Sequence, residues 1–297
     1  MANDADPVQS VKTLKYKGAV MKVWVRRAMG GLVAVMIAGY ATICYYMYSR
    51  QDALIYPGGT IEIEPLPAPP APFEAVTIDT PDGEHLKGWW HPPEPGHGVV
   101  LYLQGNRENI AVDWRLTRLR DLTDAGYGVL GLEYRGFGGS TGHPNEPGLI
   151  ADAEAGYGFI AQHAPDTRIA LFADSLGTGV AVALAARRPV AGLVLDSPYA
   201  SATRLAHLSY PWLPTSLLLR DRWDSEGRVT AIHAPVFIAH CDADRRIPLS
   251  EGKRLFDTAD QPKEMIVLPG CGHVQTWIEP VRTKVLNDFA AWIGPTR

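Results

Sequence analysis

The stretch Ile169-Ala170-Leu171-Phe172-Ala173-Asp174-Ser175-Leu176-Gly177 joins a short apolar run to an Ala-rich segment. The residues that follow, 178–187, contain no helix breaker after Gly179. This order predicts a strand, a sharp turn and a helix, with Ser175 at the tip of the turn. Such a nucleophile elbow normally has glycine on either side, as Gly-x-Ser-x-Gly, because larger side chains clash where strand and helix cross. Ala173 replaces the first glycine and adds one methyl group to a strained turn.

A literal Gly-x-Ser-x-Gly motif lies elsewhere, at Gly138-Gly139-Ser140-Thr141-Gly142. It is followed by His143-Pro144-Asn145-Glu146-Pro147, so no helix can begin directly after this serine. The flanking sequence therefore favours Ser175 over Ser140 as the nucleophile.

Strand and helix patterns alternate along the rest of the chain, after a predicted hairpin around Pro81-Asp82-Gly83. Expected strands cover 73–78, 86–90, 99–103, 127–133, 191–195, 236–240 and 265–268. Two expected helices cover 147–163 and 281–293, a third ends at 125, and a fourth begins at 250. Alternation of this kind predicts an α/β fold, with a mostly parallel sheet covered by helices on both faces. Sites in such sheets form at the carboxyl ends of the strands.

Two further chemical groups follow strands in the second half of the chain. Asp244 comes shortly after the strand 236–240, and His273 lies in a Gly-flanked loop after the last strand. A serine hydroxyl becomes a nucleophile when a neutral imidazole accepts its proton, and a carboxylate orients that imidazole. The chain order Ser, Asp, His is that of the α/β-hydrolase triad. Asp242 and Asp196, which ends the preceding strand, compete with Asp244 as the acid.

An oxyanion hole is expected beside this serine. Its donors would be the backbone N–H of Leu176 and an N–H from the loop Gln104-Gly105-Asn106-Arg107 after strand 99–103, which we assign to Asn106. We expect no cofactor and no metal site.

The N-terminal region has the pattern of a membrane anchor. Residues 28–48 are 21 uncharged, mostly apolar residues, preceded by Arg26 and Arg27 and ending in a cluster of tyrosines. A cleaved signal peptide and a buried core helix are the alternatives. The basic stretch before the span predicts a cytoplasmic segment 1–27, with the main domain on the extracytoplasmic side.

The remaining boundaries follow from composition. Five prolines between 65 and 72 predict a stiff linker over 49–72, followed by an α/β domain over 73–297. Within that domain, residues 198–235 form a long, leucine-rich connection between two strands. It is either a partial cap that lines an apolar acyl pocket or a set of helices packed on the sheet.

The net charge and the positions of the cysteines bear on the binding partners and on the cellular compartment of the protein. Residues 1–27 carry six Lys or Arg against Asp4 and Asp6, so a chain of net charge −4 has −8 on residues 49–297. An acidic main domain argues against a nucleic-acid partner. Cys241 and Cys271 lie on the two loops that carry Asp244 and His273. They either form a disulfide in an oxidising compartment or are two small packed residues.

Several longer motifs carry a family resemblance: Leu54-Ile55-Tyr56-Pro57, Gln104-Gly105-Asn106, Glu133-Tyr134-Arg135-Gly136-Phe137-Gly138, Ser175-Leu176-Gly177, Asp196-Ser197-Pro198-Tyr199 and Asp244-Arg245-Arg246-Ile247-Pro248. With them, residues 51–293 resemble the membrane-anchored serine hydrolases that have an α/β-hydrolase domain, a group that includes depalmitoylating thioesterases and uncharacterised bacterial members. The resemblance implies the α/β-hydrolase fold and supports Asp244 as the acid. The chain departs from it at Ala173, at Gln104 (usually His) and at Cys241 (usually Gly), which bears on the rate more than on the reaction class.

Together these features predict a membrane-tethered serine hydrolase that cleaves carboxylic esters or thioesters, of a small molecule or a lipid, through an acyl-enzyme. A peptidase with the same triad is an alternative, and so is a catalytically silent scaffold that binds a lipid or a protein. The sequence predicts no oligomeric state.

Overall fold

The computed structural model describes residues 7–62 and 64–295. Residues 1–6 of the expected cytoplasmic segment, residue 63 of the expected linker and residues 296–297 lie outside this description. The chain divides into two compact units, Met1–Arg50 and Gln51–Arg297.

The first unit consists of most of a single long helix, α1 (Pro7–Ile55). Within it, Val20–Ile55 contains an 18-residue window that is apolar enough to cross a membrane, with a mean hydropathy of 1.7 over that window. The expected anchor, 28–48, lies inside this stretch. The helix does not end at residue 48 but continues through Ile55, into the segment that we expected to be a linker.

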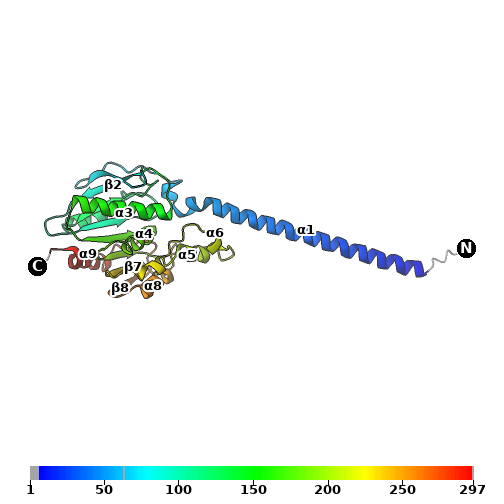
Figure 1. Ribbon diagram of the computed structural model, residues 1–297. Helices are drawn as coiled ribbons and strands as arrows, with labels where there is room; N and C mark the ends of the chain where they lie inside the picture. The colour runs from blue at the N-terminus through cyan, green and yellow to red at the C-terminus, as the bar shows by residue number, and fades with distance from the viewer. Residues whose placement is uncertain (1–6, 63, 296–297) are drawn as a thin grey trace. The chain divides into compact units, whose positions relative to one another are not determined.

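The second unit is built on one eight-stranded sheet, in the order β1-β2-β4-β3-β5-β6-β7-β8 (Figure 1). The strands are β1 (Glu74–Asp79), β2 (His85–His91), β3 (Val99–Leu103), β4 (Gly128–Leu132), β5 (Ile169–Asp174), β6 (Leu193–Asp196), β7 (Val236–Cys241) and β8 (Lys263–Leu268). β2 pairs antiparallel with β1 and with β4, and all other neighbours are parallel. The expected mostly parallel sheet is confirmed.

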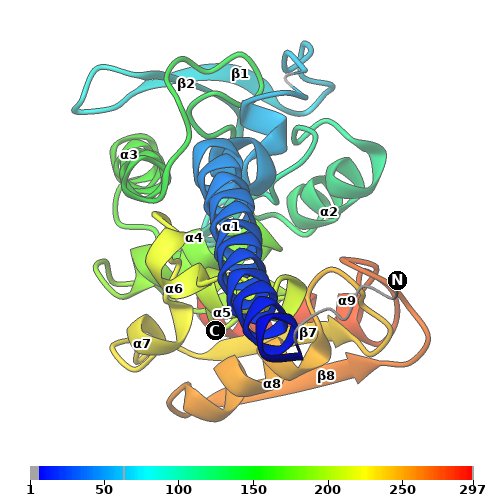
Figure 2. The same cartoon turned by 90° about the vertical axis from the view of Figure 1, so that its right-hand side faces the viewer.

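Helices cover both faces of this sheet. They are α2 (Asp113–Asp124), α3 (Glu146–His163), α4 (Leu176–Ala185), α5 (Ala202–Ser209), α6 (Thr215–Leu218), α7 (Ser225–Val229), α8 (Leu249–Thr258) and α9 (Val281–Ile293), with a 3-10 turn at Pro57–Gly59. In Figure 2, α2 and α9 lie on one side of the sheet, and α3, α4, α7 and α8 on the other. Two separate apolar clusters match these two faces.

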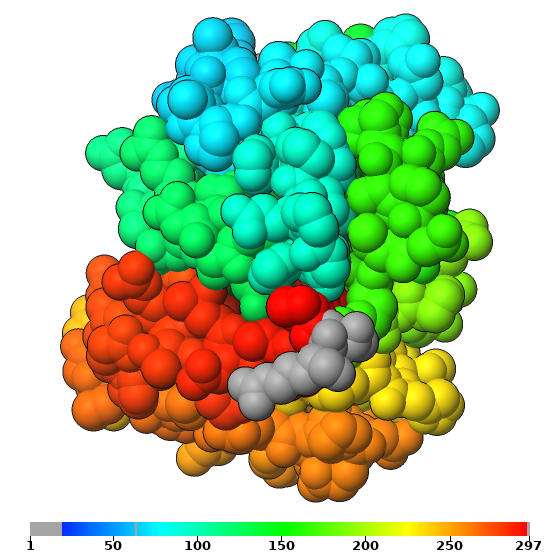
Figure 3. Space-filling model, turned by 90° about the vertical axis from the view of Figure 1, so that its left-hand side faces the viewer, coloured from blue at the N-terminus to red at the C-terminus, as the bar shows by residue number. Residues whose placement is uncertain are grey.

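The middle strands are buried on both faces because their residues are almost all apolar. Every residue of β3 and β5 is buried. β1 and β8 are the two edge strands, and the cyan and orange parts of the chain lie at opposite ends of the face shown in Figure 3. The carboxyl ends of the buried central strands therefore provide a rigid platform for the loops that follow β3, β5, β6 and β7.

The segment after α1 is not a free linker in the structure. Tyr56 is fully buried; its hydroxyl donates to Asp221 Oδ2 at 2.6 Å and accepts from Trp223 Nε1 at 2.9 Å. Gly58 and Gly59 lie against the Phe137 ring, where a Cβ at either position would collide with the ring. The sequence pattern missed these contacts because each joins residues that are far apart in the chain. Residues 51–59 therefore belong to the globular unit, ahead of the boundary expected at residue 73.

Candidate active site

The predicted elbow is present at the end of β5. Ser175 lies between β5 and α4 with φ of +51°, a left-handed conformation that a serine adopts only under strain. A Cβ at Gly177 would collide with the backbone carbonyl of Leu103, so glycine is required there. Ala173 instead lies within β5, paired with Leu103 and Leu195, and its methyl group is fully buried in the core. The substitution that departs from the elbow motif is thus accommodated.

The three residues predicted to act together lie in one hydrogen-bonded chain. His273 Nε2 is 2.8 Å from Ser175 Oγ, and His273 Nδ1 is 2.7 Å from Asp244 Oδ2. The backbone N–H groups of Arg246 and Ile247 donate to the other oxygen, Asp244 Oδ1, at 2.8 and 3.0 Å. Burial raises the pKa of Asp244, but His273 and these backbone donors outweigh burial, so the net shift of the pKa is downward. The carboxylate is therefore ionised and fixed in position.

The two competing aspartates have other partners. Asp242 is exposed and accepts a hydrogen bond from the backbone N–H of Gly270 at 2.7 Å. Asp196 forms a buried ion pair with Arg118, with 2.5 Å between Oδ2 and Nη2. The literal motif serine, Ser140, accepts a hydrogen bond from the backbone N–H of Lys87 at 2.9 Å and donates to the carbonyl of Glu133. It fastens a turn to β2.

Arg118 connects Asp196 to the loop of His273. Its guanidinium also donates to the carbonyl of Val274 at 3.1 Å, and the Val274 N–H donates to Ser197 Oγ at 3.2 Å. Val274 has φ of +52°, unusual for a β-branched residue. The loop that presents His273 is thus held through both the carbonyl and the N–H of Val274. Arg118 could not be predicted as a site residue, because a charged helix residue normally indicates a solvent-facing position.

The loop after β3 is held from two directions. Gly105 N–H donates to Asp174 Oδ2 at 2.9 Å, so this N–H is not free to act as an oxyanion donor. Asn106 Nδ2 donates to the carbonyl of Ile55 at 2.8 Å, and the carbonyl of Asn106 accepts from Gly58 N–H at 3.0 Å. The assignment of the Asn106 N–H as the second donor, with Leu176 N–H at the start of α4 as the first, stays a prediction.

Asp174, next to Ser175 in sequence, holds the loop after β3 in place. It is fully buried and accepts hydrogen bonds from Tyr102 Oη at 2.6 Å and from Arg115 Nη2 at 3.1 Å, besides Gly105. Burial raises its pKa, but Arg115 and Arg118 outweigh burial and lower the pKa below its usual value. No role was predicted for Asp174, although its position directly before Ser175 could have indicated one.

Gln104, which stands where the resembling family usually has His, contacts Glu133. Gln104 Nε2 donates to Glu133 Oε2 at 2.5 Å, and Ile110 N–H donates to Glu133 Oε1 at 2.7 Å. Both side chains are fully buried, and burial raises the pKa of Glu133 to about 7 despite these donors. Gln104 and Glu133 therefore form one buried pair at the base of the proposed oxyanion loop.

Glu133→Gln is expected to flatten part of the pH dependence of stability. A carboxyl whose native pKa lies above its unfolded value binds a proton on folding, so stability falls as the pH rises from about 4.5 to 7. The Gln104 amide can turn to accept from the new Gln side chain, because Gln104 Oε1 has no hydrogen-bond partner among the described residues. Between pH 4.5 and 7.5, the variant should gain about 3 kcal/mol of unfolding free energy relative to the parent. Denaturant titrations at several pH values measure this; parallel curves for the two proteins would contradict it.

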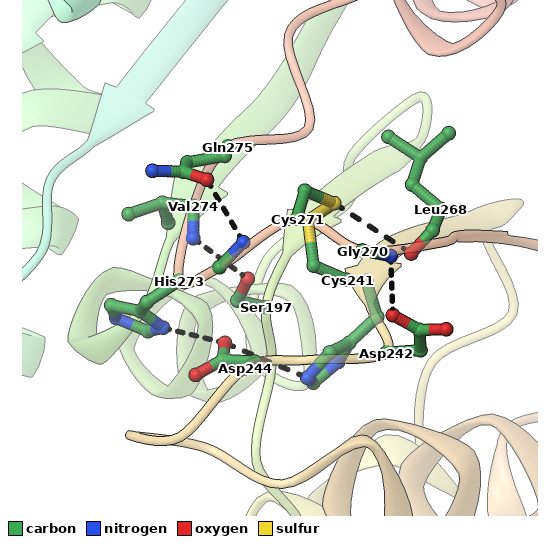
Figure 4. The surroundings of a disulfide bond; sticks show 12 residues. Ser197, Cys241, Asp242, Asp244, Leu268, Gly270, Cys271, His273, Val274 and Gln275 are labelled. Atoms are coloured by element: carbon green, nitrogen blue, oxygen red, sulfur yellow. Dashed lines mark hydrogen bonds and ion pairs between the residues drawn. A yellow bond between two sulfur atoms is a disulfide. The ribbon is translucent and has the colours of Figure 1, made fainter.

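Cys241 and Cys271 form a disulfide, with 5.2 Å between their Cα atoms (Figure 4). Cys241 is the last residue of β7, three residues before Asp244, and Cys271 precedes His273 by two residues. The bond thus ties the loop of the acid to the loop of the base. The remaining cysteine, Cys44, is free.

Replacing the disulfide, as Cys241→Ala with Cys271→Ser, should lower the unfolding free energy by about 3–4 kcal/mol on the loop-entropy model, because it closes a separation of 30 residues. Ester hydrolysis should fall as well, since the two loops are no longer tied. Thermal unfolding with and without a thiol reductant measures the first effect; Cys44→Ser is the matched control and should respond like the parent. A double variant as stable as the unreduced parent would contradict the expectation.

A cavity of about 740 Å³ opens beside Ser175 and His273. Its wall is partly aromatic, from Trp114 and Trp277, and partly cationic, from Arg115, Arg118 and Arg246. No described residue of 198–235 lines this cavity, so the structure does not give that segment the pocket-lining role that the sequence left open. Among the described residues, no group of His, Cys, Asp or Glu is placed to hold a metal ion.

A mostly parallel sheet with a serine at a strand–helix elbow, and with an aspartate and a histidine on later loops beside it, defines the α/β hydrolases. Solved structures agree on this fold. The esterase PF2001 of Pyrococcus furiosus matches with a TM-score of 0.66 and 20% identity, over 77% of this chain and 96% of the esterase. The expected α/β-hydrolase fold is therefore confirmed.

Sequence relatives establish the family. The uncharacterized protein MT2364 of Mycobacterium tuberculosis is 37% identical over 249 residues, 82% of this chain and 86% of the relative. The lysophosphatidylserine lipase ABHD12 of Danio rerio is 33% identical over 224 residues, 66% of this chain and 59% of the lipase. A family model described as serine aminopeptidase, S33, matches residues 97–222. The chain belongs to the same α/β-hydrolase family as these relatives and is a hydrolase.

Proposed function

We propose that this protein is a membrane-tethered serine hydrolase that cleaves carboxylic ester or thioester bonds through an acyl-enzyme. The chain of contacts from Ser175 Oγ through His273 to Asp244, at 2.8 and 2.7 Å, carries the proposal. These separations are those of a nucleophile, its general base and the group that orients the base.

The proposed reaction has two halves. Ser175 Oγ attacks the carbonyl carbon while its proton passes to His273 Nε2, and the N–H groups of Leu176 and Asn106 stabilise the oxyanion. The C–O or C–S bond then breaks, and His273 returns the proton to the leaving alcohol or thiol. Water attacks the acyl-enzyme with His273 again as the base, which releases the acid and restores Ser175. Asp244 stays ionised throughout and stabilises the imidazolium.

A lipid ester is the substrate class that we favour. One relative is a lipase by name, and the aromatic residues Trp114 and Trp277 give the cavity an apolar wall beside Ser175. A peptidase is the second candidate, since the matching family model is described as a serine aminopeptidase. The tether through Val20–Ile55 favours the lipid ester, because it keeps the enzyme where such substrates are concentrated.

Covalent labelling tests the reaction class. A fluorophosphonate probe on the full-length protein should yield one adduct, mapped by mass spectrometry to the peptide of Ser175. Hydrolysis of p-nitrophenyl esters, acyl thioesters and aminoacyl p-nitroanilides separates esterase, thioesterase and peptidase. Absence of an adduct, or an adduct on another serine, would overturn the proposed mechanism.

We further propose that residues 28–48 span the membrane, with 1–27 in the cytoplasm and the globular unit on the other side. The excess of Lys and Arg before the span supports this orientation. Protease added to the extracytoplasmic face of sealed vesicles should digest the globular unit. Protection from that face would reverse the orientation, and a purified protein that starts beyond residue 48 would indicate a cleaved signal peptide.

A further inference from the structure

The segment that contains α5 and α6 exposes an unusual amount of apolar surface. None of the eight residues of α5 is buried. Leu208, Tyr210, Trp212 and Leu217 have 47, 38, 54 and 83% of their surface exposed. We call these four side chains the α5–α6 surface. Clustered apolar side chains on a globular unit indicate a contact with a partner or a membrane.

This surface is tied to the C-terminal end of α1. Gln51 Nε2 donates to the carbonyl of Leu218 at 3.4 Å, and the backbone N–H of Arg220 donates to Gln51 Oε1 at 2.8 Å. Arg220 also pairs with Asp52 at 2.5 Å. Leu217, the most exposed of the four side chains, is the neighbour of Leu218 in the chain. The surface therefore lies beside Gln51 and Asp52, a few residues after the proposed span 28–48.

Its composition fits a lipid interface. Tryptophan and tyrosine are typical of the depth at which headgroups meet acyl chains. Two of the three arginines in residues 201–222 are already paired, Arg204 with Glu251 and Arg220 with Asp52, so the fit rests on the aromatic and apolar side chains and not on charge.

We propose that the α5–α6 surface inserts into the interface of the same bilayer that holds α1. The proposal rests on the membrane anchor of the proposed function. A second attachment, close to the end of α1, fixes which face of the unit meets the lipid.

Fluorescence quenching by lipids tests this contact in the full-length protein. The protein carries Cys44→Ser and Leu217→Cys, is labelled at position 217 with an environment-sensitive dye, and is reconstituted in vesicles of phosphatidylcholine and phosphatidylglycerol that contain spin-labelled lipid. We expect a blue shift and quenching at position 217. A matched label at Val267→Cys, where an apolar residue is 39% exposed on β8, should show neither. The native Cys44, labelled in the parent chain, reports on the anchor itself.

The outcomes separate the two proposals. Quenching at Cys44 but not at position 217 overturns the membrane contact and leaves the anchor intact. No quenching at Cys44 overturns the anchor and, with it, the contact that depends on it. A blue shift at position 217 without lipid quenching indicates burial against protein, such as a second copy of the chain, and also overturns the proposal.

A functional readout supplements the spectroscopy. The variant Leu208→Ser/Trp212→Ser/Leu217→Ser should hydrolyse a soluble p-nitrophenyl ester at the parental rate, since none of these residues lines the cavity. Its rate on a lipid ester in vesicles should fall. Val267→Ser should change neither rate. Equal loss on both substrates would indicate a folding defect and would count against a role confined to the membrane.

Discussion

Ser175→Ala is expected to abolish fluorophosphonate labelling and to lower kcat/KM for a short p-nitrophenyl ester by roughly 10⁴–10⁶-fold. The substitution removes the hydroxyl oxygen that lies 2.8 Å from His273 Nε2 and forms the acyl-enzyme. Residual hydrolysis should remain above the rate in water because the oxyanion donors and the cavity are unchanged. Stability should change little, because alanine keeps the Cβ and with it the backbone strain at φ +51°.

Ser140→Ala is the matched control, because it changes the serine of the literal motif. The Lys87 N–H would lose its acceptor, which costs about 1 kcal/mol of stability, while labelling and kcat/KM should stay near the parental values. An inactive Ser140 variant together with an active Ser175 variant would reverse the assignment of the nucleophile. Thermal unfolding of both variants shows whether any loss of activity comes from the fold.

Local patterns predicted most of the secondary structure. The apolar run at 99–103 and the helix at 281–293 match β3 and α9 residue for residue, because burial on both faces and helical periodicity leave clear local signals. The order of the sheet, with β3 between β4 and β5, is not visible in any local window. The same holds for Tyr56, whose partners Asp221 and Trp223 lie more than 160 positions away. Composition alone therefore assigned this residue to a linker.

The candidate site also has residues that the sequence predicts and residues that it does not. Ser175 and His273 follow from strand ends and chain order, and the family resemblance favoured Asp244 over Asp196 and Asp242. The groups that hold them cannot be predicted in this way: Arg118 and Asp174 are buried charges, and a sequence gives no sign that a charge is buried until its partner is known. The disulfide could be predicted only in part. The convergence of its two loops could be inferred from the triad, whereas the orientation of the thiols depended on the structure.

Three aspartate variants separate the acid from its competitors, and Asp244→Asn should have the largest effect on activity. The new Oδ1 can still accept from the N–H groups of Arg246 and Ile247, so the loop keeps its shape. The amide group, however, donates to His273 Nδ1 and leaves the proton on Nε2, the tautomer that cannot accept from Ser175. We expect a loss of roughly 10⁴-fold in kcat, with little change in unfolding temperature.

Asp196→Asn should show the opposite profile. Arg118 is fully buried, and without the carboxylate its charge has no counter-ion at 2.5 Å. Breaking a buried ion pair on one side costs about 3–5 kcal/mol, so the unfolding temperature should drop sharply. The protein that remains folded should keep much more activity than Asp244→Asn, because the contact between His273 and Asp244 is intact.

Asp242→Asn completes the set and should change neither property, since an amide oxygen still accepts from Gly270 N–H at this exposed position. The three variants are compared at pH 7.5, where Asp244 is ionised because its pKa is lowered. The readouts are kcat on a soluble ester, corrected for the folded fraction, and thermal unfolding by circular dichroism. If Asp196→Asn were stable and inactive while Asp244→Asn stayed active, Asp196 would be the acid, and the contact at 2.7 Å between His273 and Asp244 would be structural only.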